Sequence, residues 1–386
     1  MRAVIIACQQ KTGRCPLCMV RPRPLFPLDS GVLLDITVRM LHKAGIDEAI
    51  ICTGGRIKAF RNYMRLNPTV RKLDLHDDRL LRGSAGCLQD VAGFVGREPF
   101  LVVESDVFVD GGLPELIESH RKNRLAITVG AVPSSAWRAS DGIVEPGAPL
   151  APLGAYVMQP EVLEHIPEVG DYDIKGQLLP KLAAGPLGVS IVKYRGRHRR
   201  VFDPSSYAGL VTETLFGVFG DRPLEQMRQI GDEIWAGERV SIAKSARLVG
   251  PLVLCGDVTI GEKAFVRGPS LLCENVVVKH GAAVMASILW SGAVVGDGSV
   301  VEDAILADSF RVAKHRRLSC SVAASRRFGC KDVHALMQSG YTVSTTSTLP
   351  KHDGQEAAMR VRNYNDCGTV KSFRSLVGEE RETLRP

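Results

Sequence analysis

The stretch ARLVGPLVLCGDVTIGEKAFVRGPSLLCENVVVKHGAAV, residues 246–284, carries the clearest structural signal in the chain because apolar residues recur in it at every sixth position. Two such series run through the second half of the sequence. The first comprises Ala246, Leu252, Val258, Ala264, Ser270, Val276, Ala282, Ile288, Val294, Val300, Leu306 and Val312, and only its serine is not apolar. The second comprises Ile242, Leu248, Leu254, Ile260, Val266, Leu272, Val278 and Val284, and it lapses after Trp290.

A period of six fits neither an α-helix, which repeats every 3.6 residues, nor an ordinary strand, which repeats every two. It is typical of a triangular parallel β-helix, in which three hexapeptides make one coil and two positions of each hexapeptide point inward. The sequence therefore predicts a left-handed parallel β-helix of hexapeptide repeats over residues 240–315, with about four coils. Residues 316–386 are largely polar without this pattern, and we expect a partly disordered C-terminal extension there.

The first half of the chain alternates short apolar runs with helical spacing. The runs Ala3–Ala7, Ala49–Cys52 and Phe100–Val103 read as buried strands, and residues 32–43 read as a helix that Gly45 ends. Strands alternating with helices predict an α/β fold with a mainly parallel sheet, in which ligands bind beyond the carboxyl ends of the strands. We assign residues 1–220 to this domain and residues 221–239 to a helical linker.

Composition limits the classes of function. The chain of 386 residues is 45% hydrophobic and 24% charged, which is typical of a globular protein with two domains. A net charge of +7 favours anionic ligands but is too diffuse to indicate nucleic acid. No apolar run approaches about 18 residues, so no membrane span is expected. Ten cysteines are too few for a disulfide scaffold, and we expect a cytoplasmic protein.

Two groups of residues in the first half could carry chemistry. The loop after the first strand holds Lys11, Arg14, Arg21 and Arg23, which could wrap a triphosphate or could form a solvated basic loop. Asp106 and Asp203 each follow an apolar strand, so the two carboxylates could hold Mg²⁺ against phosphates. Each aspartate could equally well cap a helix or a turn.

Several motifs in order resemble the sugar-1-phosphate nucleotidyltransferases, especially mannose-1-phosphate guanylyltransferases. The resemblance lies in Ala3–Ala7, Arg21–Leu28, Leu41–Gly55, Gly83–Gly86, Phe100–Asp106, Glu161–Pro167, Asp173–Ile174 and Leu178–Leu182. It implies a Rossmann-like nucleotidyltransferase domain and a nucleotide base held by the turn Gly83, Ser84, Ala85 and Gly86. It further implies substrate binding at Gly154 and Mg²⁺ on Asp106 and Asp203.

The sequence departs from this family in its phosphate-binding motifs. The family's Gly-Gly-x-Gly-Thr-Arg corresponds to residues 8–13, Cys-Gln-Gln-Lys-Thr-Gly, and a family lysine is replaced by Arg23. A second family lysine, which binds sugar phosphate, is missing at Glu145–Pro146. The resemblance therefore implies that Lys11, Arg14 and Arg23 supply the catalytic cations. A basic run from Lys193 to Arg200 could add phosphate affinity or form a solvated strand face.

Three functions follow from these features. The leading one is synthesis of an NDP-sugar and pyrophosphate from an NTP and a sugar 1-phosphate, with GDP-mannose as the first candidate product. The second is a non-catalytic paralogue that binds sugar nucleotide and regulates a partner. The third is a β-helix acyltransferase using His280, although a histidine at a coil corner is the more common reading. The β-helix is expected to mediate homo- or hetero-oligomers.

Overall fold

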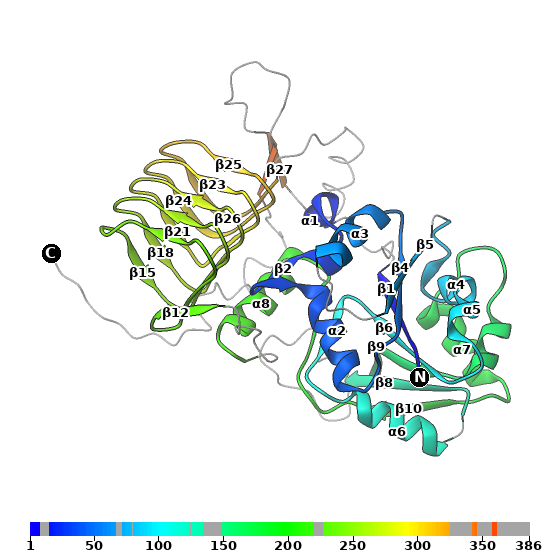
Figure 1. The fold of residues 1–386 in the computed structure, drawn as a ribbon. Coiled ribbons are helices and arrows are strands. Elements are labelled where there is room, and N and C mark those ends of the chain that lie inside the picture. The colour runs from blue at the N-terminus through cyan, green and yellow to red at the C-terminus, as the bar shows by residue number, and fades with distance from the viewer. Residues whose placement is uncertain are drawn as a thin grey trace. The chain divides into compact units, whose positions relative to one another are not determined.

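The computed structural model describes residues 1–7, 15–66, 72–78, 80–123, 125–133, 149–218 and 227–324, and the backbone of residues 342–345 and 357–360. Contacts divide the chain into two compact units (Figure 1). The first unit contains residues 1–12, 21–26 and 32–202, and the second contains residues 13–20, 27–31 and 203–386.

The first unit is built on a seven-stranded sheet in the order β10-β8-β9-β6-β1-β4-β5. Its strands are β1 (Ala3–Ala7), β4 (Ala49–Thr53), β5 (Leu73–Asp77), β6 (Phe100–Glu104), β8 (Ile127–Pro133), β9 (Leu150–Met158) and β10 (Val189–Lys193). Neighbouring strands are parallel except β9, which runs antiparallel to both β6 and β8. The three apolar runs named above are the central strands β1, β4 and β6, which confirms the α/β fold.

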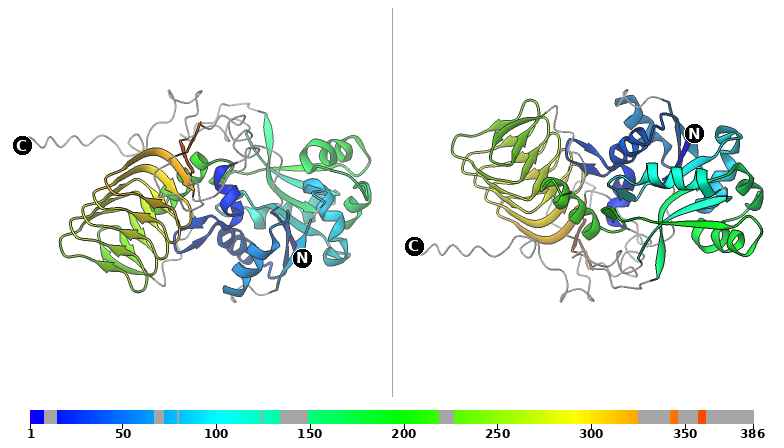
Figure 2. Two further views of the ribbon diagram at one scale, coloured as in Figure 1. Left: turned by 90° about the horizontal axis from the view of Figure 1, so that it is seen from above. Right: turned by 90° about the horizontal axis from the view of Figure 1, so that it is seen from below.

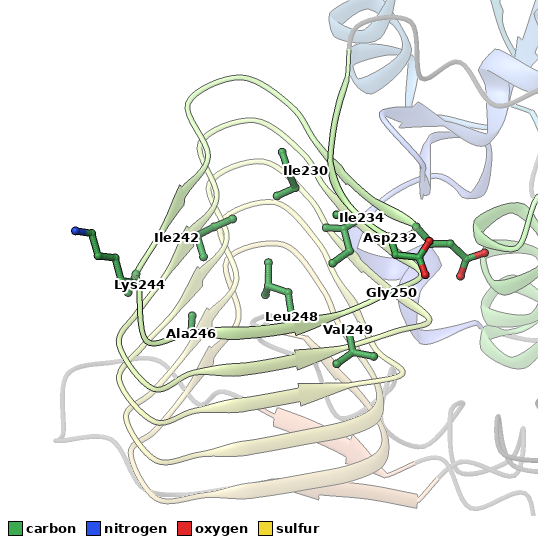
Figure 3. Close-up of a pocket in the computed structure, with 12 residues that line it drawn as sticks. Ile230, Asp232, Ile234, Ile242, Lys244, Ala246, Leu248, Val249 and Gly250 are labelled. Carbon is green, nitrogen blue, oxygen red and sulfur yellow. The ribbon is translucent and has the colours of Figure 1, made fainter. Parts of the chain in front are cut away.

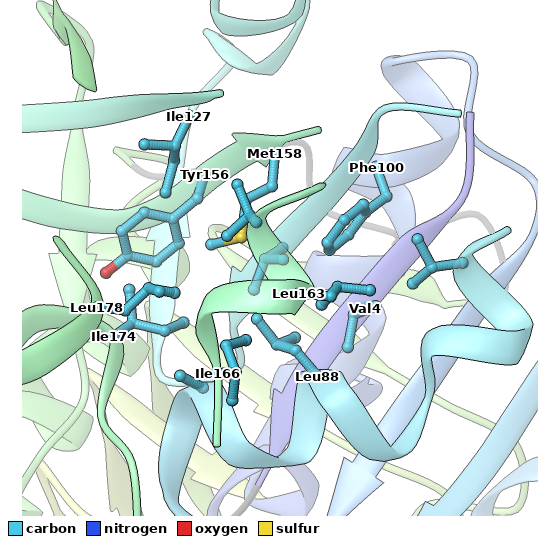
Figure 4. Close-up of a cluster of buried hydrophobic side chains, with 14 of the residues drawn as sticks. Val4, Leu88, Phe100, Ile127, Tyr156, Met158, Leu163, Ile166, Ile174 and Leu178 are labelled. Atoms are coloured by element: carbon cyan, nitrogen blue, oxygen red, sulfur yellow. The ribbon is translucent and has the colours of Figure 1, made fainter. Parts of the chain in front are cut away.

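Helices accompany this sheet: α2 (Leu33–Lys43), α3 (Ile57–Leu66), α4 (Gly83–Asp90), α5 (Ala92–Val95), α6 (Leu113–Asn123) and α7 (Leu179–Ala184). Val4 and Phe100 on one face pack in a cluster with Leu88 of α4 (Figure 4). Ile5 and Leu101, whose side chains point to the opposite face, are also fully buried. Both faces of the sheet are therefore covered, which is why its central strands are apolar throughout.

A small antiparallel pair extends the carboxyl end of β6. Strand β7 (Val107–Val109) follows β6 after two residues and pairs with β11 (His198–Arg200). Arg200 is the partner of Val107 in this register, and Val201 N donates to the carbonyl oxygen of Asp106. The pairing thus brings the basic run beside the residues that end β6.

The last segment of the second unit starts with α8 (Pro204–Leu215), whose contacts place it with the β-helix although we assigned it to the α/β domain. The predicted helical linker is wrong in its described part, residues 227–239. Those residues form the strands β12 (Arg228–Gly231) and β13 (Ile234–Ala236), which pair with each other. Their side chains Ile230 and Ile234 pack on the β-helix core, so burial favours strands that extend the coil.

The coils form three rows of short parallel strands, stacked along one axis (Figures 1 and 2). One row comprises β14 (Ser241–Ile242), β17 (Thr259–Ile260), β20 (Val277–Val278), β23 (Val294–Val295) and β25 (Arg311–Val312). A second comprises β15 (Arg247–Val249), β18 (Phe265–Arg267), β21 (Ala283–Met285) and the start of β24 (Val300–Leu306). A third comprises β16 (Leu252–Leu254), β19 (Ser270–Leu272), β22 (Ile288–Leu289) and the end of β24.

The β-helix is confirmed, but its register changes after the third coil. Pairing steps from Ile242 to Ile260 and from Ile260 to Val278 are 18 residues, and the step from Val278 to Val295 is 17. The missing residue therefore moves each inward position one residue back, so that Ala293 takes the inward position predicted at Val294. The second series continues in the core through Leu289, Val295 and Val301, which pair with Leu272, Val278 and Val284.

The missing residue also explains where the second sixfold series lapses. Because Leu289 points inward, Trp290 points out of the coil, yet its side chain is fully buried. Its indole Nε1 donates to Tyr207 Oη of α8 at 3.1 Å, and the two rings meet edge to face. The irregular coil thus provides an anchor for a helix within the second unit.

The β-helix continues past the predicted residue 315. Strand β26 (Arg317–Ala324) pairs in parallel with β24, and β28 (Ala357–Arg360) then pairs antiparallel with both β26 and β27 (Thr342–Thr345). These strands lie within the extension predicted to be partly disordered, and its other residues after Ala324 lie outside the described ones. Among the described residues, no helix is long and apolar enough to cross a membrane.

Candidate functional site

A cluster of buried charges lies at the carboxyl end of β6, within the first unit. Glu104 is the last residue of β6, and its side chain is only 3% exposed. Two residues further on, Asp106 has a side chain that is 13% exposed. Ser105 N donates to Ile6 O of β1, so the end of β6 stays in register with the central strand. The two carboxylates are thus held at the edge where open α/β sheets bind ligands.

Glu104 is bonded on both oxygens. Tyr156 Oη of β9 donates to Glu104 Oε1 at 2.9 Å. Lys175 Nζ donates to Oε2 at 2.8 Å, and Arg200 Nη2 donates to the same oxygen at 2.5 Å. Burial raises the pKa of Tyr156 well above its ordinary value, so this phenol keeps the proton that it donates. A carboxylate this deeply buried requires such partners.

Asp106 is bonded to two guanidinium groups through one oxygen. Arg200 Nε and Arg23 Nη1 lie 3.2 Å and 3.4 Å from Asp106 Oδ2, and Arg23 Nη2 also donates to Phe202 O at 3.2 Å. Burial and the nearby Glu104 raise the pKa of Asp106, while Arg200 and Arg23 act in the opposite direction. Two fixed cations donate to the same oxygen of Asp106, and such contacts favour the ionised form of a carboxyl group.

The balance of charge in this cluster is positive. Glu104 and Asp106 contribute two negative charges, and Arg23, Lys175 and Arg200 contribute three positive ones. Such a group of side chains favours an anion, and the planar guanidinium groups suit phosphate oxygens in particular. Of the predicted catalytic cations, Arg23 lies in the cluster, whereas Lys11 and Arg14 lie outside the described residues.

The predicted base-binding turn starts α4 and is bonded to a neighbouring segment. Ser84 Oγ donates to Asp173 Oδ2 at 2.6 Å and accepts from Ile174 N. The amides of Ala85 and Gly86 donate to Tyr172 O. A Cβ on Gly83 would lie 2.6 Å from that same carbonyl oxygen, so glycine is required there.

These contacts fix the turn that carries Lys175. Asp173, held by Ser84, accepts from Lys175 N and Gly176 N and so begins the π-helical turn η4 (Ile174–Leu178). The turn at residues 83–86 therefore positions a cation of the cluster. Its role in binding a base stays a prediction.

Gly154 adjoins the cluster directly. It lies on β9 with a φ of 101°, and an added Cβ would lie 2.8 Å from Val107 Cγ2 and 3.2 Å from Glu104 Oε2. Glycine is required both by the backbone and by the space beside Glu104. The sequence-based choice of Gly154 thus falls in the same place as Asp106 and Arg23, although its contact with substrate stays a prediction.

Asp203 belongs to the second unit, where it caps α8. Its Oδ1 accepts from Ser206 N at 2.7 Å and from Ser206 Oγ at 2.6 Å. This is the capping alternative stated for it above. Its closeness to Asp106 stays a prediction.

The side chains around Asp106 do not fit Mg²⁺ in this arrangement. A magnesium site offers oxygen ligands and negative charge, but here Asp106 Oδ2 is bonded to two cations. Two unit charges 4 Å apart interact by about 4 kcal/mol at an effective dielectric constant of 20, and a divalent ion doubles that repulsion from each arginine.

Other features lie away from this chemistry. A cavity of about 710 Å³ opens at the first coil of the β-helix, lined partly by Ile230, Ile242 and Leu248 (Figure 3). A second, of about 800 Å³, lies by the amino ends of β4 and β5, opposite the strand ends that carry Glu104. His280 is exposed in a turn between coils, which agrees with the common reading of such a histidine.

Sequence reasoning missed Glu104, Tyr156 and Lys175. Glu104 directly follows the apolar run of β6, so a carboxylate at that strand end was a usable signal beside Asp106. Tyr156 reads as one more core residue of β9, and Lys175 has no sequence signal, because its place depends on the contact between Ser84 and Asp173. Arg200 was part of the basic run but was not distinguished from its neighbours.

Comparison with known proteins agrees with this arrangement of elements and motifs. A family model described as nucleotidyl transferase matches residues 3–149, which include β1, β4 and the end of β6. Residues 3–149 therefore match the nucleotidyl transferase family.

Similar proteins extend the match beyond the residues that the family model covers. A UTP–glucose-1-phosphate uridylyltransferase from Synechocystis sp. is 22% identical over 81% of this chain and 89% of its own length. Mannose-1-phosphate guanylyltransferase 1 from Arabidopsis thaliana is 24% identical over 78% of this chain and 90% of its own. A solved structure from Bacillus anthracis, a putative glucose-1-phosphate thymidylyltransferase, covers 57% of this chain and 98% of its own at 15% identity, with a TM-score of 0.48.

Proposed function

We propose that this protein transfers a nucleotidyl group from an NTP to a sugar 1-phosphate, giving an NDP-sugar and pyrophosphate. The observation that carries the proposal is the cluster of Arg23, Lys175 and Arg200 around Glu104 and Asp106 at the carboxyl end of β6. The named relatives above are enzymes for uridylyl and guanylyl transfer to hexose 1-phosphates.

In this reaction a phosphate oxygen of the sugar 1-phosphate attacks the α-phosphorus of the NTP. The bond from the α-phosphorus to the bridging oxygen breaks, and the electron pair leaves with pyrophosphate. Arg23 and Arg200 would bind phosphate oxygens and offset the negative charge that develops on the leaving group. Their carboxylate partners hold both guanidinium groups in place before substrate arrives, so less ordering is needed on binding.

The proposal also includes the product, the residues that bind the triphosphate, the cellular compartment and the assembly of the protein. GDP-mannose is the product we propose first, because the residues that carry the resemblance follow the mannose-1-phosphate guanylyltransferases. Lys11 and Arg14 would bind the triphosphate together with Arg23.

We further propose that the protein works in the cytoplasm and assembles with itself or a related chain through the β-helix. The first coil of the β-helix borders the open cavity in Figure 3.

One observation favours a second candidate, a sugar-nucleotide-binding regulator without turnover. The backbone amides of Ala85 and Gly86 donate to Tyr172 O, and Asp106 Oδ2 accepts from two arginines. The amides that would bind the base and the carboxylate that would bind a metal are thus already bonded to other groups of the protein. Such a chain would keep the cationic cluster for binding phosphate and lack the rest of the catalytic apparatus.

A screen for turnover tests the proposal. The purified full chain is incubated with each NTP and a panel of hexose 1-phosphates, with Mg²⁺ and with EDTA, and pyrophosphate release is followed. We expect release that requires both substrates and that falls at least tenfold in Arg23→Ala. A thermal-shift series with NTPs and NDP-sugars runs in parallel, because a ligand that binds only the folded state raises the melting temperature. Shifts without pyrophosphate release would favour the regulator.

A further inference from the structure

Arg200 occupies the position from which a cation would bridge Glu104 and Asp106. The two acidic residues are separated by one residue at the end of β6, and the guanidinium donates to both carboxylates. A divalent ion bound between paired carboxylates would make the same kind of contact. The side chain of Arg200 is only 18% exposed, so this is a packed part of the first unit.

The backbone fixes this placement. Arg200 lies on β11 opposite Val107 of β7, and the next residue, Val201, donates its amide to Asp106 O at 2.8 Å. Arg200 and Asp106 are therefore tied together through both main chain and side chain. The guanidinium is thus a fixed part of the cluster, with hydrogen bonds on either side of it.

We infer that Arg200 takes the place of a divalent cation beside Asp106, so that the chain binds phosphate at this site without a metal held by Asp106. The identity of the phosphate compound rests on the proposed function, whereas the absence of a metal at Asp106 does not. Lys175 and Arg23 add positive charge at the same place, because each donates to one of the same two carboxylates.

The test for metal uses Mn²⁺ alone as the probe. Mn²⁺ is titrated into the wild-type chain, Asp106→Asn, Arg200→Gln and the pair Arg23→Gln with Arg200→Gln, and the bound ion is counted by electron paramagnetic resonance. We expect wild type and Asp106→Asn to bind the same amount of Mn²⁺. The doubly substituted chain should gain a site that a further Asp106→Asn removes. Mn²⁺ binding in the wild type that disappears in Asp106→Asn overturns the inference.

The test for phosphate uses inorganic pyrophosphate and calorimetry in EDTA. We expect pyrophosphate to bind the wild type equally well in EDTA and in Mg²⁺, and to bind at least tenfold more weakly to Arg200→Gln. Arg199→Gln, which removes a charge from the neighbouring residue of β11, is the matched control and should change affinity by less than threefold. Binding that requires Mg²⁺, or an equal loss in both variants, contradicts the inference.

Two comparisons keep the outcome decisive. Arg200→Lys retains the positive charge, so it replaces Arg200→Gln in both tests if Arg200→Gln does not fold. The comparison of wild type with Asp106→Asn needs no change at Arg200. A chain that shows no nucleotidyl transfer but binds pyrophosphate in EDTA fails the proposed function and leaves this inference standing. A chain that forms NDP-sugar only with a metal held by Asp106 supports the proposed function and overturns this inference.

Discussion

Arg200 joins the two carboxylates of the site: its Nε lies 3.2 Å from Asp106 Oδ2 and its Nη2 lies 2.5 Å from Glu104 Oε2. A lysine has one nitrogen and cannot match this fork. We therefore expect Arg200→Lys to lower the free energy of unfolding by about 1.5–3 kcal/mol, the range for a lost hydrogen bond between charged groups. Urea unfolding measures the change. Arg199→Lys on the same strand should cost less than about 0.5 kcal/mol, and equal losses would refute a special role for Arg200.

Gly154→Ala should damage the site itself. The new Cβ would lie 3.2 Å from Glu104 Oε2 and 2.8 Å from Val107 Cγ2, so Glu104 and its partners must shift. Gly111→Ala is the control because Gly111 has a φ of 81° but open space around its Cβ position. Both substitutions place a Cβ on a residue with positive φ, which costs about 1–2 kcal/mol in each variant. We expect nucleotide affinity to fall at least tenfold in Gly154→Ala alone, and unchanged affinity there would place the ligand elsewhere.

Leu254→Asp should unfold the β-helix, because Leu254 is fully buried in its core. An unpaired buried carboxylate costs several kcal/mol. Val249→Asp is the matched change, since Val249 lies on the adjacent strand of the same coil and is 45% exposed. Thermal melting followed by circular dichroism compares the two. A Leu254→Asp chain as stable as Val249→Asp would contradict the inward register.

Stability should fall as the pH drops below 7 because of His120. This side chain is 1% exposed, lies 2.9 Å from Thr128 Oγ1 through Nδ1, and lies 3.1 Å from Gln159 Nε2 through Nε2. Burial lowers its pKa below the ordinary value of about 6.5. The unfolded chain therefore binds a proton more readily, and stability is lost as pH falls from 6.5 toward the folded pKa.

The corresponding measurement is urea unfolding at pH 7.5 and 5.5. One histidine contributes at most about 1.4 kcal/mol per pH unit. We expect the wild type to lose more stability over this interval than His120→Gln. Burial also lowers the pKa of His198, so the difference between wild type and variant isolates His120. The same pH dependence in both chains would show that His120 has the same pKa in the folded and the unfolded state, which would contradict this prediction.

The sequence predicts the repeat of the β-helix well because each inward residue obeys a local rule. That rule cannot foresee the 17-residue coil, in which the loss of one residue turns Leu289 inward and Trp290 toward Tyr207. The strands β12 and β13 were predicted as a helical linker for a similar reason. Their conformation is decided by packing of Ile230 and Ile234 on the core, which no local periodicity records.

The candidate site is predictable only in part. Asp106 was found from its place after an apolar strand, Gly154 through resemblance and Arg23 through its loop. All three lie around the same strand end. Lys175 reaches Glu104 only because Ser84 holds Asp173, a contact between residues 89 positions apart. The pairing of Asp106 with Arg200, 94 positions away, depends on the register of β7 with β11.

The most direct test of the account is to follow the products by ³¹P NMR in wild type and Arg23→Ala. Wild type is incubated with the NTP and sugar 1-phosphate selected by the turnover screen. We expect pyrophosphate and the diphosphate of an NDP-sugar to appear in equal amounts. Arg23→Ala should bind NTP more weakly by about 1.5–3 kcal/mol, and its product formation should fall further because the charge on the leaving group grows in the transition state. Nucleotide binding by the wild type without either product, over the whole panel, would contradict the account.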